Sequence, residues 1–465
     1  MNQSAAIPFD QLLAHATQRH MAGDLPAAES LYKQLMAANP DHAFLNFAMG
    51  TLYTDRGEEA TLAFPLLLRS VALDPTNCQA WNNLGAAYKS VFHHERAVEA
   101  LEKARALDPR NPAVFANWSG LYINEGCPEQ AIPIAEEGLL YDPDSPQIHN
   151  HLALACLESG NWRQAWPNWE YRVKLPGWFT REFRPGTKRW HGQQVRNLAL
   201  SGEQGIGDEI LFTSIVPEIR HLVTGKLFIE CTARLQTLFE RSFDCVTYPS
   251  HQELLFHEHD IDACLQLGSL PRLFRPMPDT CAGTPFLKPD PVAVAEMRER
   301  LARLGPPPYV GLTWQGGTPK THRHARTLPL QMLAPIASID GCTFVSVQYG
   351  QAAMEAAHAG LTHWADAVID FDRHTALIAA CDLVISVCQT AVHQAGALGV
   401  PCWCLTPVKV AWRYGVFGGE RMPWYASVRL LRQAVSDEWE PVVERAASEL
   451  RTWLETRNSA QHAST

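Results

Sequence analysis

The stretch LALSGEQGIGDE, Leu198 to Glu209, joins an apolar segment to a helical pattern through a turn with two glycines. Leu198 to Leu200 is an apolar run typical of a buried parallel strand, and Gly205 and Gly207 permit backbone angles and close approaches that a side chain forbids. Apolar residues recur at helical spacing after Asp208. A helix that begins here directs its free N–H groups and the Asp208 carboxylate toward the strand ends, where open α/β sheets bind their ligands.

Two other interpretations of this loop stay open. A dinucleotide-binding fingerprint needs a third glycine three places after Gly207, but position 210 is Ile210. Glu230, about 20 residues further on, keeps that interpretation open as a ribose ligand. The second alternative is a tight turn in which Asp208 only caps its own helix.

The N-terminal third of the chain repeats with a period of about 34 residues. Asn-Pro or Asp-Pro dipeptides place prolines at positions 40, 75, 109 and 143. Such a period predicts a solenoid of helical hairpins. One unit matches the tetratricopeptide (TPR) pattern at its key positions, which are Trp81, Leu84, Gly85, Tyr88, Ala97, Leu101, Ala104 and Pro109.

A solenoid of this kind is expected to expose a concave groove suited to an extended peptide or a partner helix. Asn82, Asn83, Asn117 and Asn150 lie on the first helices of their hairpins, and their carboxamides suit hydrogen bonds to a peptide backbone. A solvated polar face is an equal alternative for each of them. The array can also serve only to form a homo-oligomer.

The composition is that of a soluble globular protein with two or three domains. The chain has 465 residues, of which 46% are hydrophobic and 19% are charged. Its net charge of -10 argues against general binding of nucleic acid or of an acidic membrane. We expect a cytoplasmic location, because no apolar run approaches the roughly 20 residues of a membrane span and no leader pattern is present.

The cysteines and histidines do not indicate a metal site. The twelve cysteines form no C-x-x-C pair, which suits buried free thiols in a reducing compartment. The patch His257 to Asp260 contains metal-ligating side chains, but adjacent residues rarely face one point. A solvated loop is favoured there, and we expect neither a metal nor a cofactor.

Apolar strands alternate with helices in the second half of the chain. The first set reads LALSGE, KLFIECTA and DACLQLGSL, and the second reads YVGLTWQG, CTFVSVQ, DLVISV and PCWCLT. This alternation, divided by a proline-rich stretch from Pro271 to Pro308, predicts two Rossmann-like domains with parallel sheets that face a cleft. The tryptophan-rich join Asn161 to Gly192 is expected to dock the solenoid on the next domain.

Three loops after strands of the second set carry groups suited to a diphosphate. The first holds three permanent cations, Lys320, Arg323 and Arg326, and arginine forks match phosphate oxygens, although a solvated basic loop is the alternative. In the second, the N–H groups of Gln389 to Ala391 and the Thr390 hydroxyl form an anion site at a helix start.

The third loop contains Lys409, Trp412, Arg413 and Tyr414. His393, on the first turn of the helix that Thr390 begins, suits a phosphate donor or an ordinary structural hydrogen bond equally well.

Together these motifs resemble bacterial TPR-containing glycosyltransferases, whose catalytic part is similar to the heptosyltransferases of glycosyltransferase family 9 and has a GT-B fold. The resemblance covers nearly the whole chain. The motifs that carry it are W-x-G at Trp190 to Gly192, SGEQGIGDEILF, the GLTWQGG loop ending in Arg326, DLVISVCQTAVHQAGALGVP, and WRYG with MPWY and Arg429.

The resemblance implies an α + α/β multidomain chain. Its parts are a TPR α-solenoid at residues 9–176, an acceptor-side Rossmann-like domain at 177–290 and a nucleotide-sugar-binding Rossmann-like domain at 305–457. Asp208 is the implied general base, in an acceptor-side loop with Glu203, Gln204, Gly205 and Gly207. The implied donor-binding residues are Trp314, Gly316, Lys320, Arg323, Arg326, Gln348, Gln389, Thr390, Ala391, His393 and Arg413.

The expected function is an inverting, metal-independent glycosyltransferase that moves a sugar from a nucleotide-diphospho-sugar to a hydroxyl, on a protein or peptide held by the TPR groove. The alternative is a non-catalytic TPR scaffold with a degenerate glycosyltransferase domain. Cys388 motivates it, because the related enzymes commonly have Asp-Thr where this chain has Cys388 and Gln389 before Thr390. A nucleotide-sugar epimerase is a third interpretation, which needs no acceptor.

Overall fold

The structure is a computed structural model, and it describes residues 8–56, 60–178, 187–203, 205–250, 260–317, 323–358, 360–415 and 418–462. The chain falls into two compact units, Met1–Ala155 and Cys156–Thr465. In the described residues, no helix is both long enough and apolar enough to cross a bilayer.

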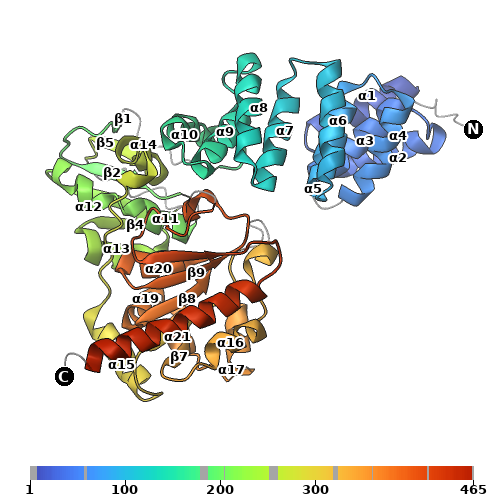
Figure 1. Cartoon of the computed structure of the whole chain (residues 1–465). Helices are drawn as coiled ribbons and strands as arrows, with labels where there is room; N and C mark the ends of the chain where they lie inside the picture. Colours follow the sequence, from blue (N-terminus) through green and yellow to red (C-terminus); the bar gives the residue numbers. More distant parts are fainter. Residues whose placement is uncertain are drawn as a thin grey trace, which may run out of the picture. The chain divides into compact units, whose positions relative to one another are not determined.

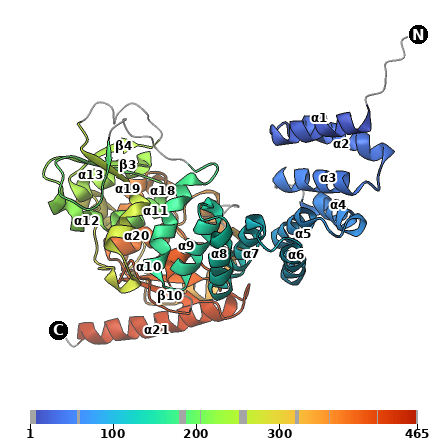
Figure 2. The ribbon, with the colours of Figure 1, turned by 90° about the horizontal axis from the view of Figure 1, so that it is seen from above.

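The first unit is built from helical hairpins (Figures 1 and 2). Its helices are α1 (Phe9–Met21), α2 (Leu25–Ala38), α3 (Ala43–Arg56), α4 (Ala60–Leu73), α5 (Cys78–Ser90), α6 (His94–Leu107), α7 (Pro112–Glu125), α8 (Pro128–Tyr141) and α9 (Pro146–Glu158), whose last turn passes into the second unit. The repeated prolines follow the ends of α2, α4, α6 and α8, because proline cannot continue a helix and frees the next hairpin to begin. The predicted helical solenoid is confirmed.

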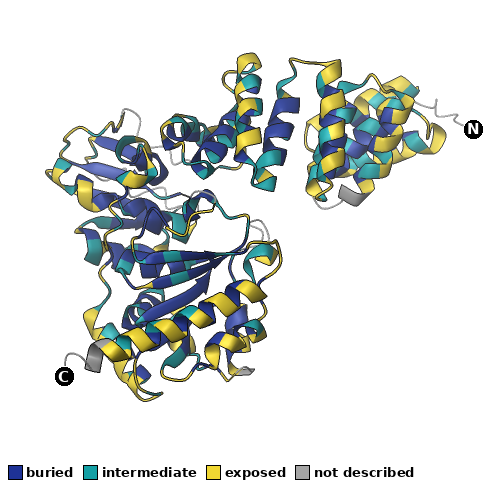
Figure 3. Ribbon diagram, viewed as in Figure 1, coloured by how far each residue is buried: buried dark blue, intermediate teal, exposed yellow. Residues whose placement is uncertain are grey.

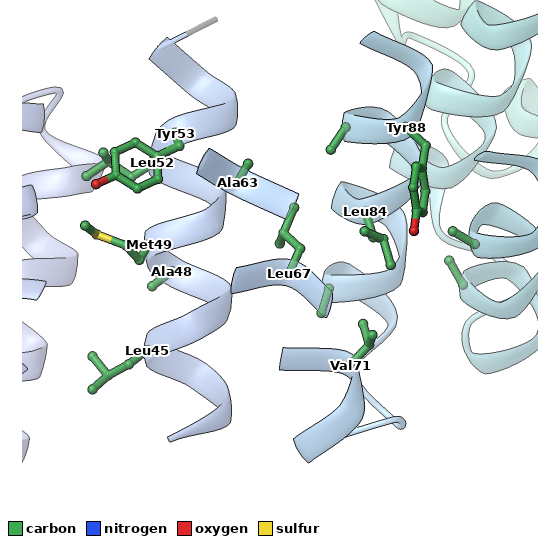
Figure 4. Close-up of a cluster of buried hydrophobic side chains, with 14 of the residues drawn as sticks. Leu45, Ala48, Met49, Leu52, Tyr53, Ala63, Leu67, Val71, Leu84 and Tyr88 are labelled. Carbon is green, nitrogen blue, oxygen red and sulfur yellow. The ribbon is translucent and has the colours of Figure 1, made fainter. Parts of the chain in front are cut away.

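Glycines at equivalent positions let the paired helices approach closely. A Cβ on Gly50 would stand 2.7 Å from Cγ of Leu67, and a Cβ on Gly85 would stand 2.7 Å from Cγ of Leu101. Figure 4 shows Leu67 among the buried side chains of α3, α4 and α5. The small residues of the repeat pattern are therefore packing positions, and the α3–α4 and α5–α6 hairpins are each closed by a leucine set against a glycine.

Replacing one of these glycines is expected to destabilise the repeat unit. In Gly85→Val the added side chain overlaps Leu101, and such overpacking costs about 2 kcal/mol of unfolding free energy. Urea unfolding followed by circular dichroism measures the change. Gln79→Ala, an exposed change on the same helix, should alter the value by less than about 0.5 kcal/mol; equal effects of the two changes would contradict this account.

Three of the four asparagines predicted to line the groove, Asn82, Asn83 and Asn117, take part in contacts between neighbouring hairpins. Adjacent first helices are linked by three polar contacts: Asn83 Nδ2 to Thr51 Oγ1 (2.8 Å), Asn117 Nδ2 to Asn82 Oδ1 (3.0 Å), and Ser119 Oγ to His151 Nδ1 (3.0 Å). Asn82 is buried, so its amide belongs to the packing of the array. Asn150 is half-buried.

The second unit contains two parallel sheets. The first belongs to the N-terminal lobe (residues 187–290), with β1 (Lys188–Arg189), β2 (Leu198–Ser201), β3 (Leu227–Cys231), β4 (Val246–Pro249), β5 (Ala263–Gln266), α11 (Ile206–Thr213), α12 (Val216–Ile219), α13 (Gln236–Phe243) and α14 (Leu270–Phe274). Its strand order is β1-β5-β2-β3-β4, and every pair is parallel.

The second sheet belongs to the C-terminal lobe (residues 291–462). This lobe comprises α15 (Pro291–Ala302), β6 (Tyr309–Leu312), α16 (Ala334–Ala337), β7 (Thr343–Ser346), α17 (Glu355–His358), α18 (Ala365–Ile369), α19 (Phe371–Ala380), β8 (Leu383–Val387), α20 (Thr390–Leu398), β9 (Cys402–Thr406), β10 (Val428–Arg432) and α21 (Glu440–His462). The strand order is β10-β9-β8-β6-β7, again with parallel pairs. Figure 3 shows the central strands of both sheets buried and α21 with one exposed face.

The predicted parallel sheets are confirmed, and all seven predicted strands are present as β2, β3, β5, β6, β7, β8 and β9. The structure adds β1, β4 and β10, each at the edge of a sheet. In the C-terminal lobe the chain begins at β6 and places β7 on one side and β8 on the other. The carboxyl ends of β6 and β8 therefore form the switch point at which doubly wound sheets bind ligands.

Helix α10 (Trp162–Trp169) is held by both lobes. On the side of the N-terminal lobe, Trp166 Nε1 donates to the carbonyl oxygen of Arg275 (2.5 Å) and Trp169 Nε1 donates to that of Gly268 (3.1 Å). Its contacts with the C-terminal lobe are aromatic: Trp162 stacks on Trp424 at 5.3 Å, and Trp166 and Trp169 meet Trp412 edge-on at 5.9 and 5.8 Å.

We call Trp162, Trp166, Trp169, Trp412 and Trp424 the tryptophan cluster; all are buried. These contacts place α10 in the second unit. The boundary between the units therefore falls after Ala155, before α10, whereas the sequence suggested a limit at 176.

Truncating the central tryptophan is expected to destabilise the second unit. Trp166→Ala leaves a cavity between α10 and Trp412 and an unpaired carbonyl at Arg275, and a loss of about 3–5 kcal/mol of unfolding free energy is expected. Urea unfolding measures it, with Met354→Ala, at a 74% exposed side chain, as control. A loss below about 1 kcal/mol in Trp166→Ala would contradict the assignment.

Candidate functional site

Two loops meet closely at the switch point of the C-terminal lobe. A Cβ on Gly316, after β6, would stand 2.3 Å from the carbonyl oxygen of Cys388, after β8. Only glycine permits this approach. Trp314 and Gln348 shape the same edge from inside the lobe, because Gln348 Oε1 accepts from the backbone N–H groups of Trp314 and Gln315 (both 3.0 Å). Both side chains are buried, so they support the loop and present no atoms at its surface.

The Asp208 carboxylate, from the N-terminal lobe, forms an ion pair with Nε of Arg413, from the C-terminal lobe. Their side chains are 14% and 21% exposed, so the pair remains accessible from solvent. The helix α11 that carries Asp208 has Gly205 as its N-cap and no side-chain cap. Asp208 thus does not cap its own helix, and its charge faces the opposite lobe.

His393, on the first turn of α20, lies beside this ion pair. A Cβ on Gly207 would stand 3.0 Å from its Cδ2, and its Nδ1 lies 3.2 Å from the Tyr425 hydroxyl. Burial lowers the pKa of His393 to about 4, opposed by Asp208 and assisted by Arg413. Burial also raises the pKa of Tyr425 above its usual value, so the phenol keeps its proton. The imidazole is neutral near pH 7 and offers one hydrogen-bond donor, without a charge.

The start of α20 combines backbone N–H groups with an unpaired carboxamide. Gln389 is the N-cap and is 5% exposed, and neither atom of its side-chain amide has a hydrogen-bond partner in the described residues. Thr390 is half-buried, with its hydroxyl 3.4 Å from that of Tyr349, and Ala391 is fully buried. Buried polar atoms normally have partners, so Gln389 marks this helix start as a candidate ligand contact.

The predicted basic loop is only partly described. Lys320 lies outside the described residues, as does Gln204 of the other lobe. Arg323 is exposed and donates through Nε to the carbonyl oxygen of Gly317 (3.2 Å). The half-buried Arg326 accepts a backbone hydrogen bond from Gly316 (3.2 Å), which folds the end of the loop back onto its start.

The Glu203 carboxylate is buried in an ion pair and is not exposed to a ligand. Its two oxygens accept from Nε and Nη2 of Arg172 at 3.1 and 2.6 Å, and both side chains are buried. This ion pair fixes the start of the turn that leads to Asp208. Gly205 is not crowded, since an added Cβ would meet nothing within 4 Å, so of Gly205 and Gly207 it is Gly207 that packs closely against a neighbour.

Glu230 cannot be the ribose ligand that the dinucleotide-binding interpretation requires. Glu230 is fully buried within β3, where a ribose has no access. Its neighbour Glu209 is also buried, and both oxygens accept from the Thr232 backbone N–H at 3.1 and 3.0 Å. Burial raises the pKa of Glu209 from 4.5 to about 7.

This raised pKa makes stability depend on pH in a defined direction. The stability that the protonated Glu209 contributes is present below pH 4.5 and is lost as the pH rises through about 7. Between pH 6 and 8 the unfolding free energy of the parent should therefore fall by about 1 kcal/mol more than that of Glu209→Gln. Urea titrations at both pH values measure this. Glu299→Gln, at a 74% exposed side chain, should behave as the parent, and parallel profiles for all three proteins would exclude the assignment.

Cys388 points into the core. It is fully buried, with Sγ 3.8 Å from Sγ of Cys404 on β9, so its side chain presents no group to a ligand. No cluster of three or more His, Cys, Asp or Glu side chains in the described part of the chain is arranged to hold a metal ion, and His257 to His259 lie outside that part.

The structure therefore brings together Asp208, Gly207, His393 and Arg413 across the two lobes, while Gly316, Gln389 and Thr390 converge at the switch point. Arg323 and Glu203 lie in separate contacts. Sequence reasoning missed Tyr349 as a site residue. Its position directly after the predicted strand CTFVSVQ, at the same sheet edge, was the available indication.

Comparison with known proteins supports the repeat region. Two tetratricopeptide-repeat family models match residues 66–106 and 90–154, so the first unit contains TPR repeats, a class of domain that mediates protein interactions. Protein FlbA of Caulobacter vibrioides is 28% identical over 499 residues, covering 94% of this chain and 83% of FlbA.

Solved structures similar to part of this chain include the following two. The MamA protein is 22% identical over 36% of this chain and 90% of its own, with a TM-score of 0.31. PilF of Pseudomonas aeruginosa is 17% identical over 46% of this chain and 86% of its own, with a TM-score of 0.35.

Proposed function

We propose that the second unit is an inverting glycosyltransferase with a GT-B arrangement, which transfers a sugar from a nucleotide-diphospho-sugar to a hydroxyl. The observation that carries the proposal is the meeting of Asp208 with Arg413 and His393 across two doubly wound lobes. An accessible carboxylate opposite a cation and a helix N-terminus is the set of groups that such a transfer needs.

The donor is assigned to the C-terminal lobe. Its diphosphate would lie at the start of α20, where the backbone N–H groups and the Thr390 hydroxyl favour an anion. The Gln389 amide is buried and unpaired in this structure, and it would offer a donor and an acceptor to a sugar hydroxyl or a phosphate oxygen once its side chain turns toward the ligand. Arg413 and the neutral His393 add one charged and one uncharged donor.

Asp208 is assigned the role of general base. As the acceptor O–H bond breaks, its proton passes to the Asp208 carboxylate, and the oxygen forms a bond to the anomeric carbon from the face opposite the diphosphate. The bond between that carbon and the phosphate oxygen breaks, and the nucleoside diphosphate leaves with the electron pair. Attack from the opposite face inverts the anomeric configuration, and the helix N-terminus and Arg413 stabilise the departing charge without a metal.

We assign binding of the acceptor, a protein or peptide, to the TPR unit. The polar contacts between its first helices fix the register of neighbouring hairpins, so an extended acceptor segment would meet a regularly repeating surface. The first unit would therefore select the acceptor and the second would perform the transfer.

A non-catalytic scaffold is the second candidate, and Cys388 favours it. The position that the related enzymes fill with an acid holds a thiol buried against Cys404. In that case the lobes would keep the fold and the TPR unit alone would act, by binding a partner.

Nucleotide release separates the two candidates. The full chain is incubated with UDP-, GDP-, ADP- and CDP-sugars, and free nucleoside diphosphate is measured. With a donor that the parent uses, Asp208→Asn should release at least about 100-fold less, the usual contribution of a general base. Asp279→Asn, which neutralises a 90% exposed aspartate, should stay within about twofold of the parent. Equal release by parent and Asp208→Asn would contradict the role of Asp208 as general base, and no release from any donor would favour the scaffold.

A further inference from the structure

The ion pair between Asp208 and Arg413 joins the two groups that the proposed reaction uses separately. Asp208 is to accept a proton, and Arg413 is to hold a departing diphosphate, yet each engages the other here. The pair spans the two lobes and is partly exposed, so a ligand reaches it without unfolding either lobe.

We propose that Asp208 is an internal ligand of Arg413, and that the diphosphate of the nucleotide-sugar donor displaces it before the acceptor reacts. This inference deepens the proposed function and rests on it. A diphosphate carries more charge and more acceptor oxygens than one carboxylate, and its geometry suits the guanidinium fork. Donor binding thereby frees the Asp208 carboxylate, so the acceptor finds an available base only when the donor is in place.

The exchange requires rotation of the Arg413 side chain and not movement of its backbone. The preceding Trp412 is locked in the tryptophan cluster, and the carbonyl oxygen of the following Tyr414 accepts from Nη2 of Arg432 (2.8 Å). The Arg413 guanidinium lies 4.9 Å from the centre of the Trp412 ring, a face along which it can turn. A fixed backbone that carries a long, partly exposed cationic side chain is what an exchange between two anions needs.

Asp208 is held in place independently of Arg413. Gly207 packs against His393, and α11 packs against α20, so the carboxylate stays at the lobe boundary when the guanidinium leaves. His393 is uncharged near pH 7 and does not replace the lost cation. The freed carboxylate therefore faces the acceptor side with its charge uncompensated, as a proton acceptor should.

The same contact favours product release. After transfer the proton leaves Asp208, and the carboxylate again competes with the nucleoside diphosphate for Arg413. Re-formation of the ion pair returns the lobes to the state seen here.

Residue-resolved carboxyl labelling tests the exchange. The full chain is treated with a carbodiimide and glycine ethyl ester, with and without UDP, GDP, ADP or CDP, and labelling at Asp208 is read by peptide mass spectrometry. Calorimetry establishes which nucleotide binds. That nucleotide should raise labelling of Asp208 about fivefold or more, the size of a typical coupling between two ligands. In Arg413→Gln, labelling should already be high and should not rise further.

Asp372 provides a matched control, because it pairs with Arg241 between the same two lobes and is 22% exposed. Its labelling should not respond to the nucleotide. If a nucleotide binds and Asp208 labelling is unchanged or falls, the exchange is excluded while the donor site stands. If no nucleotide binds the parent, the proposed function fails and the exchange fails with it.

Discussion

The second unit depends on one helix whose tryptophans reach both lobes. In α10, two indole N–H groups are bonded to carbonyls of the N-terminal lobe, while the indole rings contact Trp412 and Trp424 of the C-terminal lobe. The apolar area buried here is large, and each polar tip that contacts the N-terminal lobe has a partner. Because Trp412 precedes Arg413, the packing that joins the lobes also positions the cation of the candidate site.

A second buried contact fixes the other side of the site. The bidentate pair of Arg172 and Glu203 ties the turn before α11 to the segment that follows α10. Breaking such a pair leaves an uncompensated buried charge, so the turn has little freedom. The tryptophan cluster and the Arg172–Glu203 pair therefore bring Arg413 and Asp208 together. Of these three contacts, the ion pair between Asp208 and Arg413 is the one most easily broken, since it alone is open to solvent.

Local patterns predicted much of this structure. The proline spacing identified the hairpins, and apolar runs located the central strands, because both depend on neighbours within a few residues. The edge strands β1, β4 and β10 were not predicted. They carry charged or proline residues such as Arg189, Pro249 and Arg429, which interrupt the apolar pattern. Asp208 and Arg413 were each singled out, but their pairing joins positions 205 residues apart and no spacing rule reveals it. For the same reason the sequence places Glu203 in the acceptor-side loop without revealing its partner Arg172, which lies 31 residues earlier.

Gly207 sets the distance between the lobes at the point where they touch. Its backbone lies directly against the His393 ring, because an added Cβ at position 207 would stand only 3.0 Å from Cδ2 of that ring. The ring is itself held by Tyr425, so neither surface can retreat easily. Position 207 thus limits how closely α11 and α20 can pack. A side chain there would act as a spacer between the two lobes, and it would offer a way to trap a form in which the lobes lie further apart.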